Sequence, residues 1–322
     1  MVQILVMGGT QFVSEALAKF FISKGYEVDI FTRGTREITY QGVRTHFIGD
    51  RNVPLDIKKN ISDKQYDYIF DITAYHKNHV KTLLDYVDRS NLKRYVLCSS
   101  GAVYAPTNQT LFEDFERAEN YNWGQYGLDK KEAEDYLFAL YKQEGFPITI
   151  FRPSYIYGEG NNLYREAYIF DRLTKKLPIP IPNHVGPVQF VHIDDVALVM
   201  ESVIGSEQSN GQAYNLSYPE DIKWKTLIDI ASQIVGIEAH TVEVDETVLN
   251  PGISTRNYFP FRNVPYTMNI EKLNAYHLYV PQINLHTGLQ KAYCLYRTEN
   301  VQLNDATMNK IDEVIRIFSL QS

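Results

Sequence analysis

A tyrosine and a lysine four residues apart are the side chains of this sequence best suited to acid–base chemistry. Tyr126 and Lys130 fall in an amphipathic stretch at 126–143. Residues at i and i+4 share one face of a helix, so the phenol and the ammonium can meet. A nearby cation favours the phenolate and lowers a reference pKa of about 10 toward the range of a general base. The sequence holds 24 tyrosines, so this spacing alone also arises easily by chance.

Two serines strengthen that interpretation. Ser99 and Ser100 directly follow the apolar run at 95–98, which predicts a strand. Ligands of a parallel sheet lie at the carboxyl ends of its strands, so these hydroxyls are expected beside the ligand crevice. Serine, tyrosine and lysine, each on the element expected for it, give a stronger signal together than the pair alone.

The elements that must position these side chains alternate between strand and helix. Helical patterns, notably at 77–89 and 126–143, separate most of a series of short apolar runs. These runs predict strands at 2–7, 26–31, 44–48, 67–72, 94–98 and 148–151. The alternation predicts an α/β fold with a parallel sheet covered on both faces, for which the Rossmann doubly wound arrangement is the default.

The pattern changes after about residue 158. Proline alternates with isoleucine at 178–182, which excludes a helix interior or a central strand and predicts an extended connector. We therefore expect a Rossmann domain over 1–158, to which 191–216 returns, and a smaller substrate-binding region over 159–322. Within that region the sequence predicts helices at 194–204, 224–235 and 304–318 and little regular structure at 250–268.

The turn after the first predicted strand is where a dinucleotide fingerprint belongs. It reads Gly8-Gly9-Thr10-Gln11-Phe12-Val13-Ser14 and keeps only Gly8 of the three glycines in a GxxGxxG spacing. Backbone N–H groups at the start of a helix can still bind a phosphate. Gln11 either adds a donor or crowds the cofactor, and an ordinary strand-to-helix turn explains the loop about as well.

The end of the second predicted strand indicates which cofactor is bound. An acidic residue there accepts from a ribose 2′-hydroxyl, whereas an arginine accommodates a 2′-phosphate. Counted from Gly8, this position falls near Thr32, and Arg33 follows it with Arg36 close by. This favours NADP, and the alternative is that both arginines are solvated loop charges.

Taken in order, these motifs resemble the extended short-chain dehydrogenase/reductase superfamily, in particular its NAD(P)-dependent epimerase/dehydratase family. The resemblance covers roughly residues 2–290. The matching segments are Gly8-Gly9-Thr10, Gly49-Asp50, 99–104, Tyr126 with Lys130, Arg152-Pro153, Tyr157-Gly158, 191–197 and 213–216. The altered glycine loop and Thr32-Arg33 are similar to an atypical subgroup that includes the chloroplast stem-loop RNA-binding proteins.

The resemblance implies a role for each matching residue. Tyr126 would be the acid/base, Ser100 would hydrogen-bond the reacting oxygen, and Lys130 would hold the nicotinamide ribose. In a sugar epimerase of this type, a hydroxyl proton is taken while hydride leaves, and the ketone is then reduced from its other face. The implied cofactor residues are Gly8, Thr10, Gln11, Phe12, Arg33, Asp50, Thr73, Ala74 and Lys130. The residues expected near the substrate are His76, Tyr155 and Arg165.

Three departures from the family pattern bear on the substrate. Gly101-Ala102 stand where dehydratases carry Asp-Glu, which disfavours sugar dehydration. Tyr155 stands where sugar-nucleotide enzymes often have asparagine. Val188 aligns with an arginine that grips the diphosphate in some epimerases. The last two changes weaken the expectation of a UDP-sugar.

Composition excludes several other classes. With 44% hydrophobic and 22% charged residues, this chain of 322 residues is neither disordered nor fibrous. Its net charge of −7 argues against a general nucleic-acid binder. Two cysteines without metal or redox spacing fit a reducing compartment, and no apolar run is long enough to span a membrane. We therefore expect a cytoplasmic protein.

Other candidate residues have simpler explanations. His76 and His79 could place two imidazoles on one helical face, but no third ligand is apparent, so we expect solvated histidines and no metal site. His192 is expected to be a satisfied core group, and Asp194-Asp195 to interact with the start of a helix.

Two functions from different classes remain after this comparison of residues. The first is an NAD(P)-dependent epimerase or oxidoreductase acting on a sugar or sugar nucleotide. The rival is a non-enzymatic RNA-associated or cofactor-sensing protein on the same fold, which would need a basic surface stripe. A homodimer through the helices at 77–89 and 126–143 is expected by analogy with the fold.

Overall fold

The computed structural model describes residues 1–62, 64–183, 185–299 and 302–319. Its central feature is a seven-stranded sheet in which every neighbouring pair of strands is parallel. The strands are β1 (Gln3–Met7), β2 (Glu27–Thr32), β3 (Val43–Ile48), β4 (Tyr68–Asp71), β5 (Arg94–Cys98), β6 (Ile148–Pro153) and β10 (Gln212–Leu216). The predicted Rossmann doubly wound fold is confirmed, and each predicted strand is present with its ends shifted by at most two residues.

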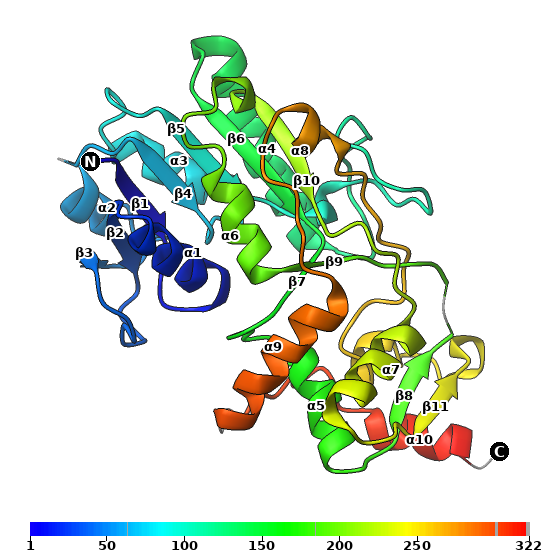
Figure 1. Ribbon diagram of the computed structural model, residues 1–322. Helices are drawn as coiled ribbons and strands as arrows, with labels where there is room; N and C mark the ends of the chain where they lie inside the picture. Colours follow the sequence, from blue (N-terminus) through cyan, green and yellow to red (C-terminus); the bar gives the residue numbers. More distant parts are fainter. Residues whose placement is uncertain (63, 184, 300–301, 320–322) are drawn as a thin grey trace.

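The order of the strands creates the crevice that a ligand needs. The sheet runs β10-β6-β5-β4-β1-β2-β3, so the chain moves outward from β1 to β3 and then returns to the other side of β1 with β4 (Figure 1). A doubly wound sheet binds its ligands where the order reverses, beyond the carboxyl ends of the strands. The loops after β1, β4, β5 and β6 therefore border the expected site.

Helices cover both faces because side chains alternate along each strand. Ile4 and Val6 of β1 face one hydrophobic cluster, and Leu5 and Met7 face the other. On the first face α1 packs against α6, and on the second α3 packs against both α2 and α4. These helices are α1 (Phe12–Ser23), α2 (Pro54–Ile61), α3 (Lys77–Tyr86), α4 (Gln125–Glu144) and α6 (Ile193–Glu201).

The rest of the chain forms a smaller region with its own aromatic core, drawn below the sheet in Figure 1. It contains two parallel strand pairs, β7 (Tyr155–Tyr157) with β9 (Phe190–His192) and β8 (Ile179–Pro182) with β11 (Thr241–Val244). Its helices are α5 (Glu166–Thr174), α7 (Trp224–Val235), α9 (Leu285–Thr298) and α10 (Ile311–Ser319), whereas α8 (Glu271–Ala275) lies beside β10 of the large sheet.

Two expectations for this region need correction, and one helix was not predicted. The proline-rich run is a strand and not a connector, because β8 pairs on one side only and its prolines need no second ladder partner. The last helix begins at Ile311 rather than at 304, and α9 was not predicted. The helix expected at 224–235 is confirmed by α7. None of the described helices is long and apolar enough to cross a membrane.

Candidate active site

The structure brings Ser100, Tyr126 and Lys130 to one cleft of about 500 Å³. The cleft lies beyond the carboxyl ends of β4, β5 and β6, where the order of the sheet predicts a ligand. Five other residues singled out from the sequence also line it, namely Gln11, Phe12, Thr73, Tyr155 and Arg165. Residues from both regions of the chain therefore meet in this cavity.

The start of α4 brings Tyr126 toward the serines. The helix begins after Gly124, whose φ of +57° is a left-handed conformation that glycine adopts without strain. A Cβ atom on Gly127 would lie 2.4 Å from the carbonyl oxygen of Ala102, so only glycine allows the helix to approach this closely. Because Ala102 follows Ser100 by two residues, this contact positions Tyr126 beside the serine turn.

Lys130 is fixed between the ends of two strands. Its Nζ donates to the carbonyl oxygens of Ala74 at 2.7 Å and Cys98 at 2.8 Å, and it lies 5.2 Å from the centre of the Tyr75 ring. The side chain is buried, and this burial lowers the pKa of the ammonium. Two of its three N–H donors are used in these bonds, so the ammonium is held in place with one donor left to face a ligand.

The two serines have different partners. Ser100 Oγ accepts a hydrogen bond from Ala102 N at 3.1 Å, which leaves its own proton available to a reacting oxygen. Ser99 Oγ instead donates to Glu134 Oε1 at 2.5 Å. This difference favours Ser100 over Ser99 as the hydroxyl that meets a substrate.

The charges that act on Tyr126 come partly from an unexpected place. Burial raises the pKa of the phenol, while the Ser100 hydroxyl and the positive charges of Arg165 and Arg262 lower it. From the sequence, Lys130 was the only cation expected to lower the pKa of Tyr126. Arg262 was missed because it lies in the stretch at 250–268 that carries no motif, and no spacing in the sequence connects it to Tyr126.

The turn after β1 has the shape of a phosphate site despite its missing glycines. Gly8 and Gly9 adopt φ values of +116° and +129°, and a Cβ atom on Gly8 would lie 2.6 Å from Ser14 Cβ. Phe12 holds a strained φ of +43° at the first position of α1. Gln11, the residue before it, makes no side-chain capping bond, so the N–H groups that begin the helix stay open to an anion. The geometry fits a dinucleotide pyrophosphate, and Thr10 borders a neighbouring cavity of about 390 Å³.

The adenine side of the expected cofactor site is open. Arg33 follows the end of β2 and Asp50 follows the end of β3; hydrogen bonds from Asn52, and to a smaller extent the charge of Arg33, lower the pKa of Asp50. Thr73 is held by a bond of 2.6 Å from Arg51. Arg33 is exposed and Asp50 is half-buried, so both are accessible to a ligand.

The two histidines at the start of α3 differ from the expectation. His79 is buried rather than solvated. Its Nδ1 accepts from Tyr75 N at 3.1 Å, and its Nε2 lies 2.7 Å from Asn52 Oδ1. Burial lowers the pKa of His79 to about 4, so the ring is neutral at physiological pH. The ring of His76 lies against that of His79, with the two ring centres 3.6 Å apart. His76 is not among the residues that line the cleft.

A second cluster has the residue types of a metal site without the chemistry of one. Glu159, His192 and Asp194 lie within 4.8 Å of one another. His192 Nδ1 accepts from Asp194 N at 3.2 Å, so the neutral ring carries its proton on Nε2, 3.0 Å from the Glu159 carboxylate. A metal ion would need Nε2 without its proton. The Lys291 ammonium also already contacts the carboxylates of Glu159 and Asp194. These groups form an ion-pair cluster.

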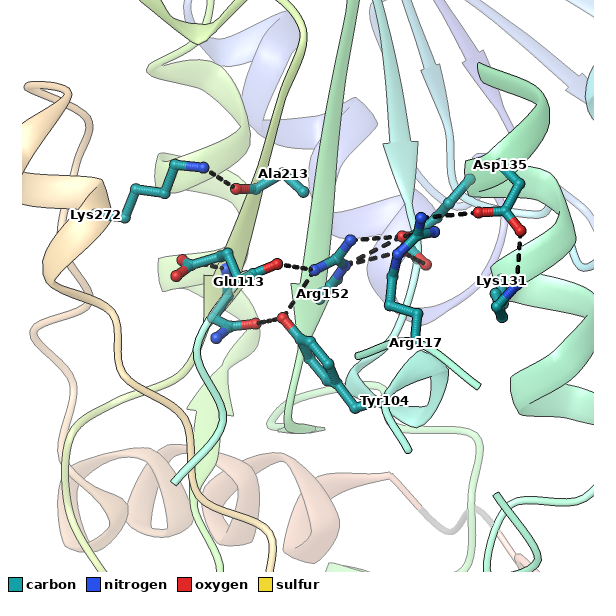
Figure 2. Close-up of polar contacts among 11 residues, drawn as sticks. Tyr104, Glu113, Arg117, Lys131, Asp135, Arg152, Ala213 and Lys272 are labelled. Atoms are coloured by element: carbon teal, nitrogen blue, oxygen red, sulfur yellow. Dashed lines mark hydrogen bonds and ion pairs between the residues drawn. The ribbon is translucent and has the colours of Figure 1, made fainter. Parts of the chain in front are cut away.

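Behind the cleft, a buried ionic network connects the elements that carry it. Glu134 of α4 is fully buried and accepts from Arg152 Nη2 at 2.7 Å and Arg117 Nη1 at 3.0 Å, in addition to Ser99. Figure 2 shows Arg152 between Tyr104 and Glu113 on one side and Arg117 on the other. Because Glu134 follows Lys130 by one helical turn, the network fixes the orientation of α4 against β5 and β6.

Comparisons with known proteins agree with this geometry. The chain belongs to the NAD dependent epimerase/dehydratase family, whose profile matches residues 4–217. It is 27% identical to the chloroplast stem-loop binding protein of 41 kDa b of Arabidopsis thaliana over 310 residues, which cover 91% of this chain and 79% of the relative. It is 23% identical to the UDP-glucose 4-epimerase of Vibrio cholerae over 215 residues, or 64% of this chain and 59% of that protein.

Solved structures share the fold at lower identity. A UDP-glucose 4-epimerase of Thermotoga maritima with UDP-glucose superposes with a TM-score of 0.76 at 16% identity, covering 92% of this chain and 99% of that one. The dTDP-glucose 4,6-dehydratase of Bacillus anthracis in complex with NAD gives 0.78 at 16% identity, covering 93% and 98%. The likeness therefore extends over both regions of the chain.

Proposed function

We propose that this protein is an NAD(P)-dependent epimerase or oxidoreductase that acts on a sugar or sugar nucleotide. The observation that carries the proposal is the convergence of Ser100, Tyr126 and Lys130 on one cleft at the point where the strand order reverses. Family membership and the names of several relatives, among them a UDP-glucose 4-epimerase, support the same class of reaction.

Each side chain has a chemical task in this reaction. Tyr126 accepts the proton of the substrate hydroxyl when its carbon is oxidised and returns it when the ketone is reduced. Ser100 donates a hydrogen bond to the same oxygen and keeps it within reach of the phenol. Lys130, held by two carbonyl groups, presents its remaining N–H to the cofactor ribose and keeps the site positive. When bound, the nicotinamide supplies the hydride acceptor and donor.

The first experiment identifies the cofactor and tests Tyr126. Any small molecule that co-purifies with the protein is released by mild denaturation and identified by mass spectrometry, and the emptied protein is titrated with NAD and NADP by calorimetry. We expect Tyr126→Phe to reduce turnover by about 10²-fold or more and to leave the cofactor Kd within about twofold. Full turnover by this variant would disprove the mechanism.

We propose that the cofactor is NADP. The position of the acidic residue that recognises a ribose 2′-hydroxyl is occupied by Thr32, whose Oγ1 is bonded to His46 Nε2 at 2.7 Å and to Gly34 N at 3.0 Å. The exposed Arg33 beside it is free to meet a 2′-phosphate. We expect Arg33→Ala to weaken NADP binding by about tenfold and to leave NAD binding unchanged. Tighter binding of NAD by the wild-type protein would contradict the preference.

One relative supports the rival function. The protein from Arabidopsis thaliana, named a stem-loop binding protein, matches this chain over 91% of its length. An RNA-associated protein that keeps the fold and the cofactor site would bind RNA with a steep salt dependence. A cofactor-sensing protein would instead bind NAD(P) without turnover.

A further inference from the structure

The charge of the cleft is opposite to that of the whole protein. The chain has a net charge of −7, yet the residues that line the cleft in the described part of the structure include Lys130, Arg165 and Arg262 and no aspartate or glutamate. A concave site of one sign concentrates ligands of the opposite sign. The cleft is therefore suited to a substrate that carries negative charge.

Aromatic rings hold the two arginines in place. The Arg165 guanidinium lies 5.2 Å from the centre of the Tyr155 ring and 5.5 Å from that of Phe261. The Arg262 guanidinium lies 4.8 Å from the centre of the Trp123 ring, and its Nε donates to the carbonyl oxygen of Asn122. Stacking fixes the plane of a guanidinium and leaves its remaining N–H groups free to point along that plane.

The two arginines have no carboxylate partner in the described part of the chain. No ion pair involves Arg165 or Arg262 there, whereas Arg44, Arg51, Arg89, Arg117, Arg152 and Arg256 each pair with a carboxylate. Burial lowers the pKa of both guanidinium groups, and an arginine in a protein nevertheless stays charged. Two partly buried cations that line a cleft without a carboxylate partner are available to an anion from outside the chain.

A third group in the same wall lacks a partner. Tyr155 is 4% exposed, and its buried hydroxyl has no acceptor among the described residues, although the backbone N–H of Arg262 is close enough to lower its pKa. A buried hydroxyl without an acceptor destabilises the protein, so it marks a place where a ligand completes the bonding. Because Arg165 stacks on the ring of Tyr155, the orphan hydroxyl and the guanidinium belong to one part of the cleft.

We propose that Tyr155, Arg165 and Arg262 form a subsite for an oxyanion of the substrate, either a phosphate or a carboxylate. A guanidinium binds such a group through two parallel N–H donors, and the Tyr155 hydroxyl adds a third direction. Val188, which aligns with an arginine of some epimerases, is fully buried and bonds to Ile222, so that position cannot reach a ligand. The anion is therefore held by residues other than the one at position 188. This assignment rests on the proposed function of the same cleft.

The test measures anion binding without turnover. The full-length protein is titrated by calorimetry with inorganic phosphate, pyrophosphate, UDP and citrate. We expect binding by the wild-type protein that weakens about tenfold or more in Arg165→Met and Arg262→Met and about threefold in Tyr155→Phe. Arg297→Met is the matched control, because Arg297 also stacks on a tyrosine, at 5.9 Å from Tyr293, but does not line the cleft.

The outcomes separate the sources of the anion and the two proposals. Tighter binding of pyrophosphate and UDP than of citrate indicates a phosphoryl group, and the reverse order indicates a carboxylate; both support the subsite. Binding that is unaffected by either cleft arginine, or equally weakened by Arg297→Met, overturns it. Anion binding that depends on the arginines in a protein without turnover keeps the subsite and disproves the proposed reaction. Turnover in a protein that shows no anion binding dependent on these arginines supports the proposed reaction and overturns the subsite.

Discussion

At the scale of single residues, the side chains that could be predicted are those related by local geometry. Tyr126 and Lys130 lie on one helix, so a spacing of four residues was enough to bring them together. Arg165 and Arg262 act on Tyr126 from positions 39 and 136 residues further along the chain. A sequence pattern cannot relate residues so far apart in the chain. These charges come near the phenol only because the smaller region packs against the Rossmann domain.

The electrostatics of Tyr126 lead to a pH prediction. Burial raises the pKa of its phenol, and the charge of Arg262 lowers it. Because Tyr126 must be deprotonated to act as a base, kcat/KM for oxidation should rise as the pH rises through this pKa. Removing the positive charge in Arg262→Met raises the pKa, so the rising limb should move to higher pH.

The measurement is the pH profile of kcat/KM for the wild-type protein and two variants. Arg297→Met should keep the wild-type profile, because Arg297 does not line the cleft. A profile that stays in place in Arg262→Met, with only its height reduced, would contradict an electrostatic action on Tyr126.

At the scale of elements, α4 carries two candidate catalytic residues and a buried glutamate at intervals of one turn. Tyr126 faces the cleft, Lys130 holds the ends of β4 and β5, and Glu134 accepts from Ser99, Arg117 and Arg152. The helix and its first two residues of interest were predicted from the sequence. Glu134 was not, although it continues the same spacing, because a glutamate in a helix is most often solvated.

The buried network behind the cleft leads to a stability prediction. Glu134→Ala would leave the Arg152 guanidinium, which is 1% exposed, without its counter-ion. We expect the free energy of unfolding to fall by about 3–5 kcal/mol, since breaking a buried ion pair strands a charge. Chemical denaturation measures the change. Glu132→Ala, on the exposed side of α4, should change the stability by about 0.5 kcal/mol or less. Equal losses in the two variants would show that the network has no special role.

The edge strand β10 shows a limit of prediction from sequence at this scale. Its carbonyl at Ala213 accepts from Lys272 Nζ at 3.0 Å, and Asn215 N donates to Glu113 Oε1 at 2.9 Å (Figure 2). Side chains thus satisfy ladder groups that would otherwise be open to another strand. Lys272 comes from α8 and Glu113 from a loop, both distant from β10 in the sequence, so the apolar pattern of the strand contained no sign of this protection.

At the scale of the whole molecule, both regions of the chain contribute to the cleft. The turn after β5 supplies Ser100, helix α4 supplies Tyr126 and Lys130, and the smaller region supplies Arg165 and Arg262. The alternation of strands and helices was sufficient to predict the first set. The second set comes from a part of the chain rich in loops, where the sequence has few periodic signals.

The distribution of charge over the whole molecule favours the proposed enzyme over an RNA-associated protein. An RNA-binding protein needs a surface that neutralises several phosphates, whereas this chain has 39 acidic and 32 basic residues and gathers unpaired cations inside a cleft of about 500 Å³. Such a cavity is of the size that holds a small molecule.

We therefore expect no shift of a stem-loop RNA at about 0.15 M salt in a gel assay, and only weak binding at low salt. The control is Arg262→Met, which should lose anion binding and leave any weak RNA binding unchanged, because Arg262 lines the cleft and weak RNA binding is expected on the outer surface. Binding of RNA that survives at this salt concentration, with an affinity that falls steeply as salt is added, would instead identify an RNA-binding surface outside the cleft and favour the rival function.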